Sequence, residues 1–326
     1  MAVQLPQTPS NRLIKTSIAL AVSAALSPTL WAAETVDLTN SSVDSTTNGA
    51  VVSGDKTSVT VLNGQTIINW NSFGLASSES IDFTNTGGTL AGTVVLNRVI
   101  GADSSLIDGT VTTTNVETLI FANSNGITVG DNFVNTGAAT SNLMFSTKDI
   151  SSLSGYDVDT NNFGLTLGTD NDADLVINGT ISTIEPADYK LSLVSGADVN
   201  IGATGDDGDK VATSFLTITA DGAVDGSTGT LDVDGEVSIS ATGAVDVNLI
   251  KSAPIFVDTN GNITIDQQAN GLEIGQLEGA DISLTAAQSS PVQLNNPITA
   301  TSDSQVATNT SFSGDENIIS DGTITI

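Results

Sequence analysis

Short runs of alternating apolar and polar residues, separated by Gly, Asn and Asp, constrain the fold of this chain more than any other feature. The clearest runs are residues 58–62, 191–194, 216–219, 237–240, 263–266 and 282–285. Alternation with a period of two residues, bounded by turn formers, is typical of strands with one buried face. Beyond residue 33, no stretch of about a dozen residues shows the 3.6-residue apolar period of a helix. The sequence therefore predicts an all-β protein.

The second half of the chain repeats loosely. Segments such as ADVNIGATG, GEVSISATG and ADISLTAAQ share a turn, an apolar-x-apolar strand and another turn. Their spacing is irregular, at roughly 20 residues, which marks a degenerate repeat. Stacked parallel strands explain this pattern, because each aliphatic side chain packs on a similar one in the next layer. Aromatic residues make up only 4% of the chain, fewer than most β-sandwiches of this size contain. We expect a parallel β-helix, with a β-sandwich or an up-and-down barrel as the alternative.

Residues 1–33 have the layout of a secretory signal peptide. The basic residues Arg12 and Lys15 precede an apolar run at 17–26, and the small residues at 32–33 offer a cleavage site. The apolar run is shorter than the about 20 residues that span a bilayer as a helix. No later stretch is apolar enough to do so. We therefore expect export of the chain and no insertion into a membrane.

The charge and the missing residue types narrow the function. Without Arg12 and Lys15, six basic residues remain against 37 acidic ones, a net charge of −31. Such a surface repels nucleic acid and anionic lipid. The chain has no cysteine, so no disulfide would hinder passage through a pore unfolded. It has no histidine either, which excludes Ser-His-Asp and Cys-His sites and His-ligated zinc or haem.

Four segments occur in a specific order in the first half of the chain. They are Trp70 with Phe73, Leu96-Asn97-Arg98-Val99, Asn123-Ser124-Asn125-Gly126-Ile127, and residues 143–150, which end in Ser-Thr-Lys-Asp-Ile. This order resembles the secretion domain of filamentous-haemagglutinin-type exoproteins, which leave Gram-negative bacteria by two-partner secretion. The resemblance covers about a quarter of the chain. It departs from the family pattern at Ser124, where the family usually has proline.

The resemblance implies a fold, a domain organisation and a partner. It implies a right-handed parallel β-helix, with residues 34–150 as the secretion domain including an N-terminal cap, and 151–326 as further coils of a truncated or short helix. The partner would be a cognate outer-membrane β-barrel transporter, and the protein would be extracellular or on the cell surface. The secretion motif would comprise Trp70, Phe73, Asn97, Arg98, Asn123, Asn125 and Gly126.

Each motif residue also has a purely structural interpretation. Asn and Gly accept left-handed backbone angles, and an Asn side chain can bond its own backbone two residues on, so residues 123–126 suit a sharp turn. Arg98, the only arginine after the signal segment, lies in an apolar strand. It would contact the transporter or form an ion pair with the nearby Asp103 or Asp108. Trp70 and Phe73 suit core anchors better than a sugar platform.

One acidic segment invites a calcium interpretation. Asp170, Asp172 and Asp174 occupy positions one, three and five of an EF-hand loop. The pattern then fails, because Leu175 replaces the glycine at position six and Ile181 replaces the glutamate at position twelve. These three aspartates are therefore weak candidates, and the sequence predicts no firm metal site and no cofactor.

The favoured function is a non-enzymatic, adhesin-like exoprotein that binds host or surface glycans or proteins. The alternative is a secreted polysaccharide-active enzyme, since parallel β-helices host pectin-degrading enzymes and glycoside hydrolysis needs paired carboxylates. Six basic residues in the exported chain are few for gripping an acidic sugar. A structural surface element, such as an autotransporter passenger or an ice-binding solenoid, is a third interpretation.

Overall fold

A computed structural model of the chain divides into two compact units, residues 1–36 and 37–326. The structure describes residues 38, 41–137, 142–153, 156–157, 162–163, 167, 172–182, 190–202, 210–250, 254–267, 272–286, 292–295, 298–301, 304–307, 312–313, 318–320 and 324–325. All of them belong to the second unit, and the expected signal peptide lies outside them. They contain strands and no helix, so the prediction of an all-β protein is confirmed for this part of the chain.

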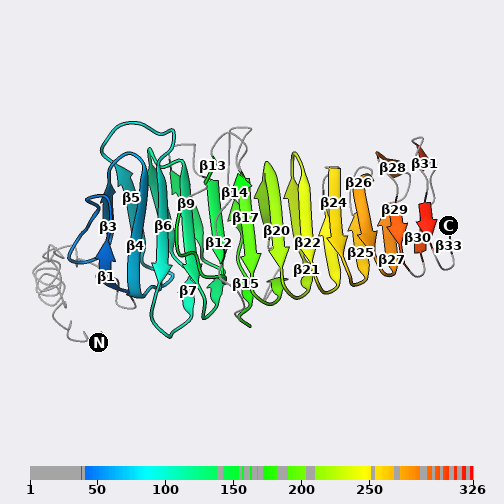
Figure 1. Cartoon of the computed structure of the whole chain (residues 1–326), viewed down its shortest axis with the longest axis horizontal. Coiled ribbons are helices and arrows are strands. Elements are labelled where there is room, and N and C mark those ends of the chain that lie inside the picture. Colours follow the sequence, from blue (N-terminus) through cyan, green and yellow to red (C-terminus); the bar gives the residue numbers. More distant parts are fainter. Residues whose placement is uncertain are drawn as a thin grey trace, which may run out of the picture. The chain divides into compact units, whose positions relative to one another are not determined.

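The largest sheet, sheet A, has 14 strands. Its main path runs in chain order through β1 (Ser42–Thr46), β4 (Gln65–Ser72), β6 (Val94–Val99), β9 (Thr118–Asn123), β12 (Asn142–Ser146), β17 (Lys190–Ser195), β20 (Phe215–Ala220), β22 (Val237–Ala241), β24 (Pro254–Thr259), β26 (Leu272–Gly279), β28 (Val292–Leu294) and β31 (Phe312–Ser313). The short strands β29 (Ile298–Ala300) and β32 (Ile318–Ser320) extend it beside this path. Figure 1 shows these strands following one another from blue to red.

Sheet C has 12 strands and accompanies sheet A along the chain. Its strands are β7 (Ser105–Ile107), β10 (Ile127–Val129), β15 (Leu175–Ile177), β16 (Ile181–Ser182), β18 (Val199–Ile201), β19 (Lys210–Thr213), β21 (Val224–Val233), β23 (Val245–Leu249), β25 (Ile263–Gln267), β27 (Ile282–Ala286), β30 (Ser304–Ala307) and β33 (Ile324–Thr325). The chain thus returns alternately to sheet A and to sheet C.

Sheet B is confined to the first half of the chain and has five strands. They are β2 (Val51–Val52), β3 (Ser58–Val61), β5 (Ser80–Asn85), β8 (Thr110–Thr114) and β11 (Val134–Gly137). A separate antiparallel pair is formed by β13 (Tyr156–Asp157) and β14 (Asn162–Phe163).

Parallel pairing in register places like residues in rows. In sheet A, Leu191, Leu216, Val237, Ile255 and Ile274 are successive partners, and all are buried. Burying each such side chain contributes about 1.5–3 kcal/mol. A shift of one residue would turn a whole row to the opposite face, so these rows fix the register.

Antiparallel pairing occurs at the N-terminal end of sheets A and B. There β1 pairs antiparallel with β4, and β2 pairs antiparallel with β3. The other described pairs of these two sheets are parallel. The two antiparallel pairs lie where the sequence led us to expect an N-terminal cap.

Candidate functional site

The four segments that carry the family resemblance lie on neighbouring strands. Trp70 is on β4, Asn97 and Arg98 are on β6, Asn123 ends β9, and residues 143–146 are on β12. These strands are hydrogen-bonded neighbours in sheet A, in that order (Figure 1). The sheet thus brings together segments that are separated along the sequence.

A buried hydrogen bond joins the first two segments. The Nε1 atom of Trp70 donates to Oδ1 of Asn97 at 3.1 Å. Asn97 lies in an inward row between Ile68 and Phe121 and is 1% exposed. Its Nδ2 atom donates to the carbonyl of Ile120 at 3.3 Å, so both ends of the amide have partners. A polar residue is tolerated in this apolar row because its hydrogen bonds are made inside the protein.

Aromatic rings surround this bond in the core. The rings of Trp70 and Phe73 meet edge-on with centroids 5.0 Å apart, and Phe121 stacks on Phe145 at 5.6 Å. Phe73 links the two pairs, since its ring centroid lies 5.4 Å from that of Phe121. Trp70 is 0% and Phe73 is 3% exposed. They are therefore core anchors, and a surface sugar platform at these residues is ruled out.

The turn at residues 123–126 has the mechanism expected from its sequence. The backbone N–H of Asn125 donates to Oδ1 of Asn123 at 2.9 Å, the local bond of an Asx turn. Gly126 has a φ of +108°, in the left-handed region that favours glycine. Its N–H donates to the carbonyl of Asn123 at 3.1 Å and closes the turn.

The two asparagines of this turn tie it to the preceding loop. Nδ2 of the buried Asn123 donates to the carbonyl of Asp103 and to Oγ of Ser105, both at 2.9 Å. Nδ2 of the exposed Asn125 donates to the carbonyl of Gly101 at 2.8 Å. These side chains therefore link the turn at residues 123–126 to the segment at residues 101–105. Asn125 is also exposed at the surface.

Arg98 does not form the expected ion pair with Asp103 or Asp108. Within the described part of the chain, its guanidinium donates to Oδ1 of Asn69 at 2.9 Å and to the carbonyls of Ile150 and Ser151 at 3.2 and 3.3 Å. The expectation failed because Arg98 points to the outer face of sheet A, where the chain after β12 folds back. Carbonyl oxygens of this returning segment, at Ile150 and Ser151, accept hydrogen bonds from the guanidinium in place of a carboxylate.

A second apolar cluster lies under this returning segment. It is separate from the main core and comprises Val94, Leu96, Ile120, Ala122, Met144, Ile150, Leu153 and Val194, with Ile67 and Leu167 packed against it. Strands β6, β9, β12 and β17 of sheet A are thus buried on both faces. This explains the nearly continuous apolar runs in β6, β9 and β12. Arg98 fastens the edge of the segment that covers the cluster.

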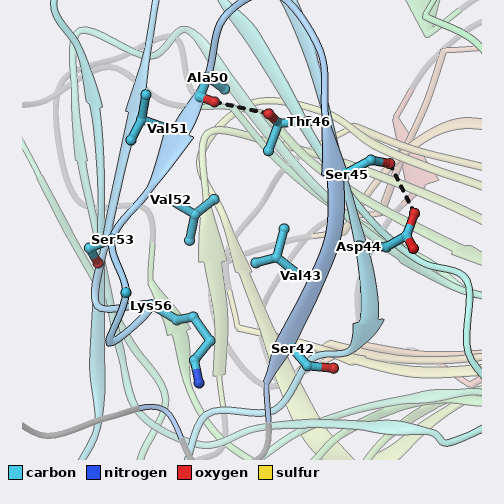
Figure 2. A pocket seen from close by; sticks show the side chains of 11 residues that line it. Ser42, Val43, Asp44, Ser45, Thr46, Ala50, Val51, Val52, Ser53 and Lys56 are labelled. Carbon is cyan, nitrogen blue, oxygen red and sulfur yellow. Dashed lines mark hydrogen bonds between the residues drawn. The ribbon is translucent and has the colours of Figure 1, made fainter.

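A groove of about 560 Å³ opens between β1, β2 and the loop at 53–56 (Figure 2). Val43 and Val52 face each other in its middle, and Lys56 lies near one end. Thr46 at the opposite end donates through Oγ1 to the carbonyl of Ala50 at 2.9 Å. Because β1 and β2 are edge strands in the described sheets, an extended peptide could join either by main-chain hydrogen bonds.

The calcium candidates are only partly described. Asp170 lies outside the described residues, whereas Asp172 and Asp174 are exposed. Oδ1 of Asp174 accepts the backbone N–H of Asp198 at 3.1 Å, which gives this carboxylate a structural role. No group of three or more potential metal-ligating side chains occurs among the residues that the structure describes.

Two carboxyl groups elsewhere have perturbed pKa values. The pKa of Asp55 is lowered, chiefly because Oγ of Ser53 donates to it at 2.6 Å. The pKa of Asp246 is raised above 3.8 by partial burial and by the charges of Asp225 and Asp266 on neighbouring strands. The lowered pKa of Asp55 thus reflects hydrogen bonds within its loop, and the raised pKa of Asp246 reflects burial and repulsion.

Sequence reasoning missed several residues that support the motif. Asn85 is buried at the end of β5, and its Nδ2 atom donates to Oγ1 of Thr93 at 3.0 Å and to the carbonyl of Asn115 at 3.1 Å. The signal was available, because β5 ends in Asn with glycine soon after, as β9 does. The role of Asn69 as a partner of Arg98 had no such signal.

Compared with protein-family models and with curated proteins, the sequence matches none. Among the described residues, none forms a helix long and apolar enough to cross a membrane.

Proposed function

We propose that the exported chain is a right-handed parallel β-helix with an N-terminal cap. The parallel order of strands in sheets A and C and the alternation of the chain between them support this architecture. The antiparallel pairs β1–β4 and β2–β3 support a cap at the N-terminal end.

The protein would be a non-enzymatic, adhesin-like exoprotein. It would leave a Gram-negative cell through a cognate outer-membrane β-barrel transporter by two-partner secretion. The observation that carries this proposal is that the segments of the resemblance bond to one another: Trp70 to Asn97, and Arg98 to the carbonyl of Ile150. A chance match of short motifs gives no reason for such mutual contacts.

The contacts also suggest what the motif does. Asn97 and Asn123 are buried and fully engaged, so they would act by making the fold of the secretion domain. Asn125 is exposed at the same turn and remains available to a transporter. With no cysteine, the chain could cross the pore unfolded and then fold by contacts between neighbouring strands.

Secretion from a heterologous Gram-negative host tests this proposal. The tagged chain is expressed with and without a family transporter, as wild type, Asn125→Ala and Asn132→Ala. Asn132 is a matched control: it is also an exposed turn asparagine, and its Nδ2 bonds to Asp108 at 3.2 Å. We expect transporter-dependent appearance in the medium, reduced by Asn125→Ala and unchanged by Asn132→Ala.

Two outcomes would contradict the proposal. Equal release without the transporter would remove the two-partner route. Folded protein retained in the periplasm despite the transporter would do the same. An equal loss in both asparagine variants would show that residue 125 has no special part in secretion.

A further inference from the structure

Phe256 presents an aromatic ring on the outer face of sheet A. It lies on β24 between Ile255 and Val257, which are 0% and 2% exposed and point inward. Because side chains alternate along a strand, Phe256 points outward, and it is partly exposed. β20, β22, β24 and β26 lie next to one another here (Figure 1).

The neighbouring strand has a gap that receives this ring. Between β24 and β26 the register shifts, with Ile255 opposite Ile274 and Phe256 opposite Gln276, so that Gly275 is the extra residue of a bulge. A Cβ atom on Gly275 would collide with Cζ, Cε1 and Cε2 of Phe256. Contact with all three atoms at the far end of the ring means that the ring lies flat over Gly275. One face of the ring therefore covers the backbone, and the other is turned outward.

A second outward phenylalanine shows what is different at Phe256. Phe215 lies on β20 of the same sheet, and Nζ of Lys190 lies 5.7 Å from its ring centroid. Its ring is thus engaged in a cation–π contact. Within the described part of the chain, Phe256 has no ring or cation contact of this kind.

Hydrogen-bonding side chains extend from the Phe256 ring across the strands. Ser238 is its register partner on one side, with Thr217 beyond it, and Gln276 is its partner on the other. Neighbouring strands are about 4.8 Å apart, so hydroxyl and amide groups recur across the face at this interval. Farther along, Oε1 of Glu273 accepts from Asn295 at 2.8 Å.

We propose that this face binds a linear neutral glycan, with one sugar ring stacked on Phe256. A flat aromatic ring offers an apolar platform for the C–H face of a sugar, and the surrounding polar groups can bond its hydroxyls. The exposed carboxylates of Asp258 on β24 and Glu278 on β26, and of Glu236 just before β22, repel anionic polysaccharides. This inference rests on the proposed adhesin-like function and names the class of ligand that such a protein would hold.

Binding of purified exported chain to hexasaccharides tests the inference. The probes are cellohexaose, maltohexaose and N-acetylchitohexaose, with hexagalacturonate as the anionic comparison, measured by calorimetry and saturation-transfer NMR. We expect at least one neutral probe to bind and hexagalacturonate not to bind. Phe256→Ala should raise the Kd about tenfold or more.

Two variants make the test specific. Gly275→Ala keeps the ring but lifts it from the sheet, so it should weaken binding as Phe256→Ala does. Phe215→Ala removes an outward phenylalanine whose ring already contacts Lys190, so this variant should leave the Kd within about twofold. Circular dichroism checks that each variant keeps its strands.

Binding of no neutral probe, or equal weakening by Phe215→Ala and Phe256→Ala, would overturn the inference. Since the assay uses folded protein and no transporter, its failure leaves the secretion result intact. Conversely, glycan binding by a chain that needs no transporter would support this site while refuting the proposed route of export.

Discussion

The bond between Trp70 and Asn97 predicts a strong energetic coupling between these residues. Trp70→Phe would leave Oδ1 of the buried Asn97 without its partner, and Asn97→Leu would leave the indole N–H without one. An unsatisfied buried polar group costs about 1–3 kcal/mol, whereas replacing both partners by apolar groups can be nearly neutral. The double variant should therefore be more stable than the sum of the single effects predicts, by about 1–3 kcal/mol.

Urea unfolding of the four proteins, followed by far-ultraviolet circular dichroism, measures this coupling. The coupling is the difference between the free-energy change of the double variant and the sum of the single changes. This difference cancels the effect that each substitution has on its own, including its own change in side-chain volume. Additivity within about 0.5 kcal/mol would refute the view that the hydrogen bond holds Asn97 in an apolar row. Equal m values across the set would confirm that the comparison concerns the same transition.

Three further predictions concern the turn at residues 123–126, the segment after β12 and the carboxyl group of Asp246. Gly126→Ala should lower the free energy of unfolding by about 1–2 kcal/mol because of its positive φ, whereas Gly54→Ala, with open space around the new methyl group, should change it little; urea titration distinguishes them. Arg98→Lys cannot reach the same set of oxygens, so hydrogen exchange should speed up around Ile150 without change in strands far from it. The raised pKa of Asp246 means that the folded chain holds this proton more tightly than the unfolded chain, so stability falls as pH rises above 3.8 through the raised pKa. Asp246→Asn should therefore have a higher melting temperature than wild type at about pH 7 and an equal one at about pH 3, and equal melting temperatures at both would contradict the assigned repulsion.

Strand periodicity predicted much of the fold, because half-buried strands leave a period-two signal. The run at residues 216–219 became part of β20, and the run at 263–266 became part of β25. The turn at 123–126 was also predictable, since the bond of Asn125 to Asn123 is local. Strands covered on both faces, such as β6, give no alternation, and the sequence marked β6 only through the resemblance.

Contacts between distant segments were beyond sequence reasoning. Arg98 was expected to pair with an acid nearby in the chain, but its partners Ile150 and Ser151 lie 52 and 53 residues away. Backbone carbonyls have no sequence signature, so nothing marked them as partners. The ring of Phe256 over Gly275 depends on a bulge, which the loose repeat did not reveal.

The inward rows of sheet A have a consequence for how such chains vary in length. From β20 to β26, each strand offers similar aliphatic neighbours to the strands before and after it. Deleting or duplicating one complete repeat would therefore leave every remaining row with compatible neighbours. An insertion of a single residue within a strand would instead reverse which residues face inward. Length variation among related chains should thus occur in whole repeats or in the turns between strands, and rarely within a strand.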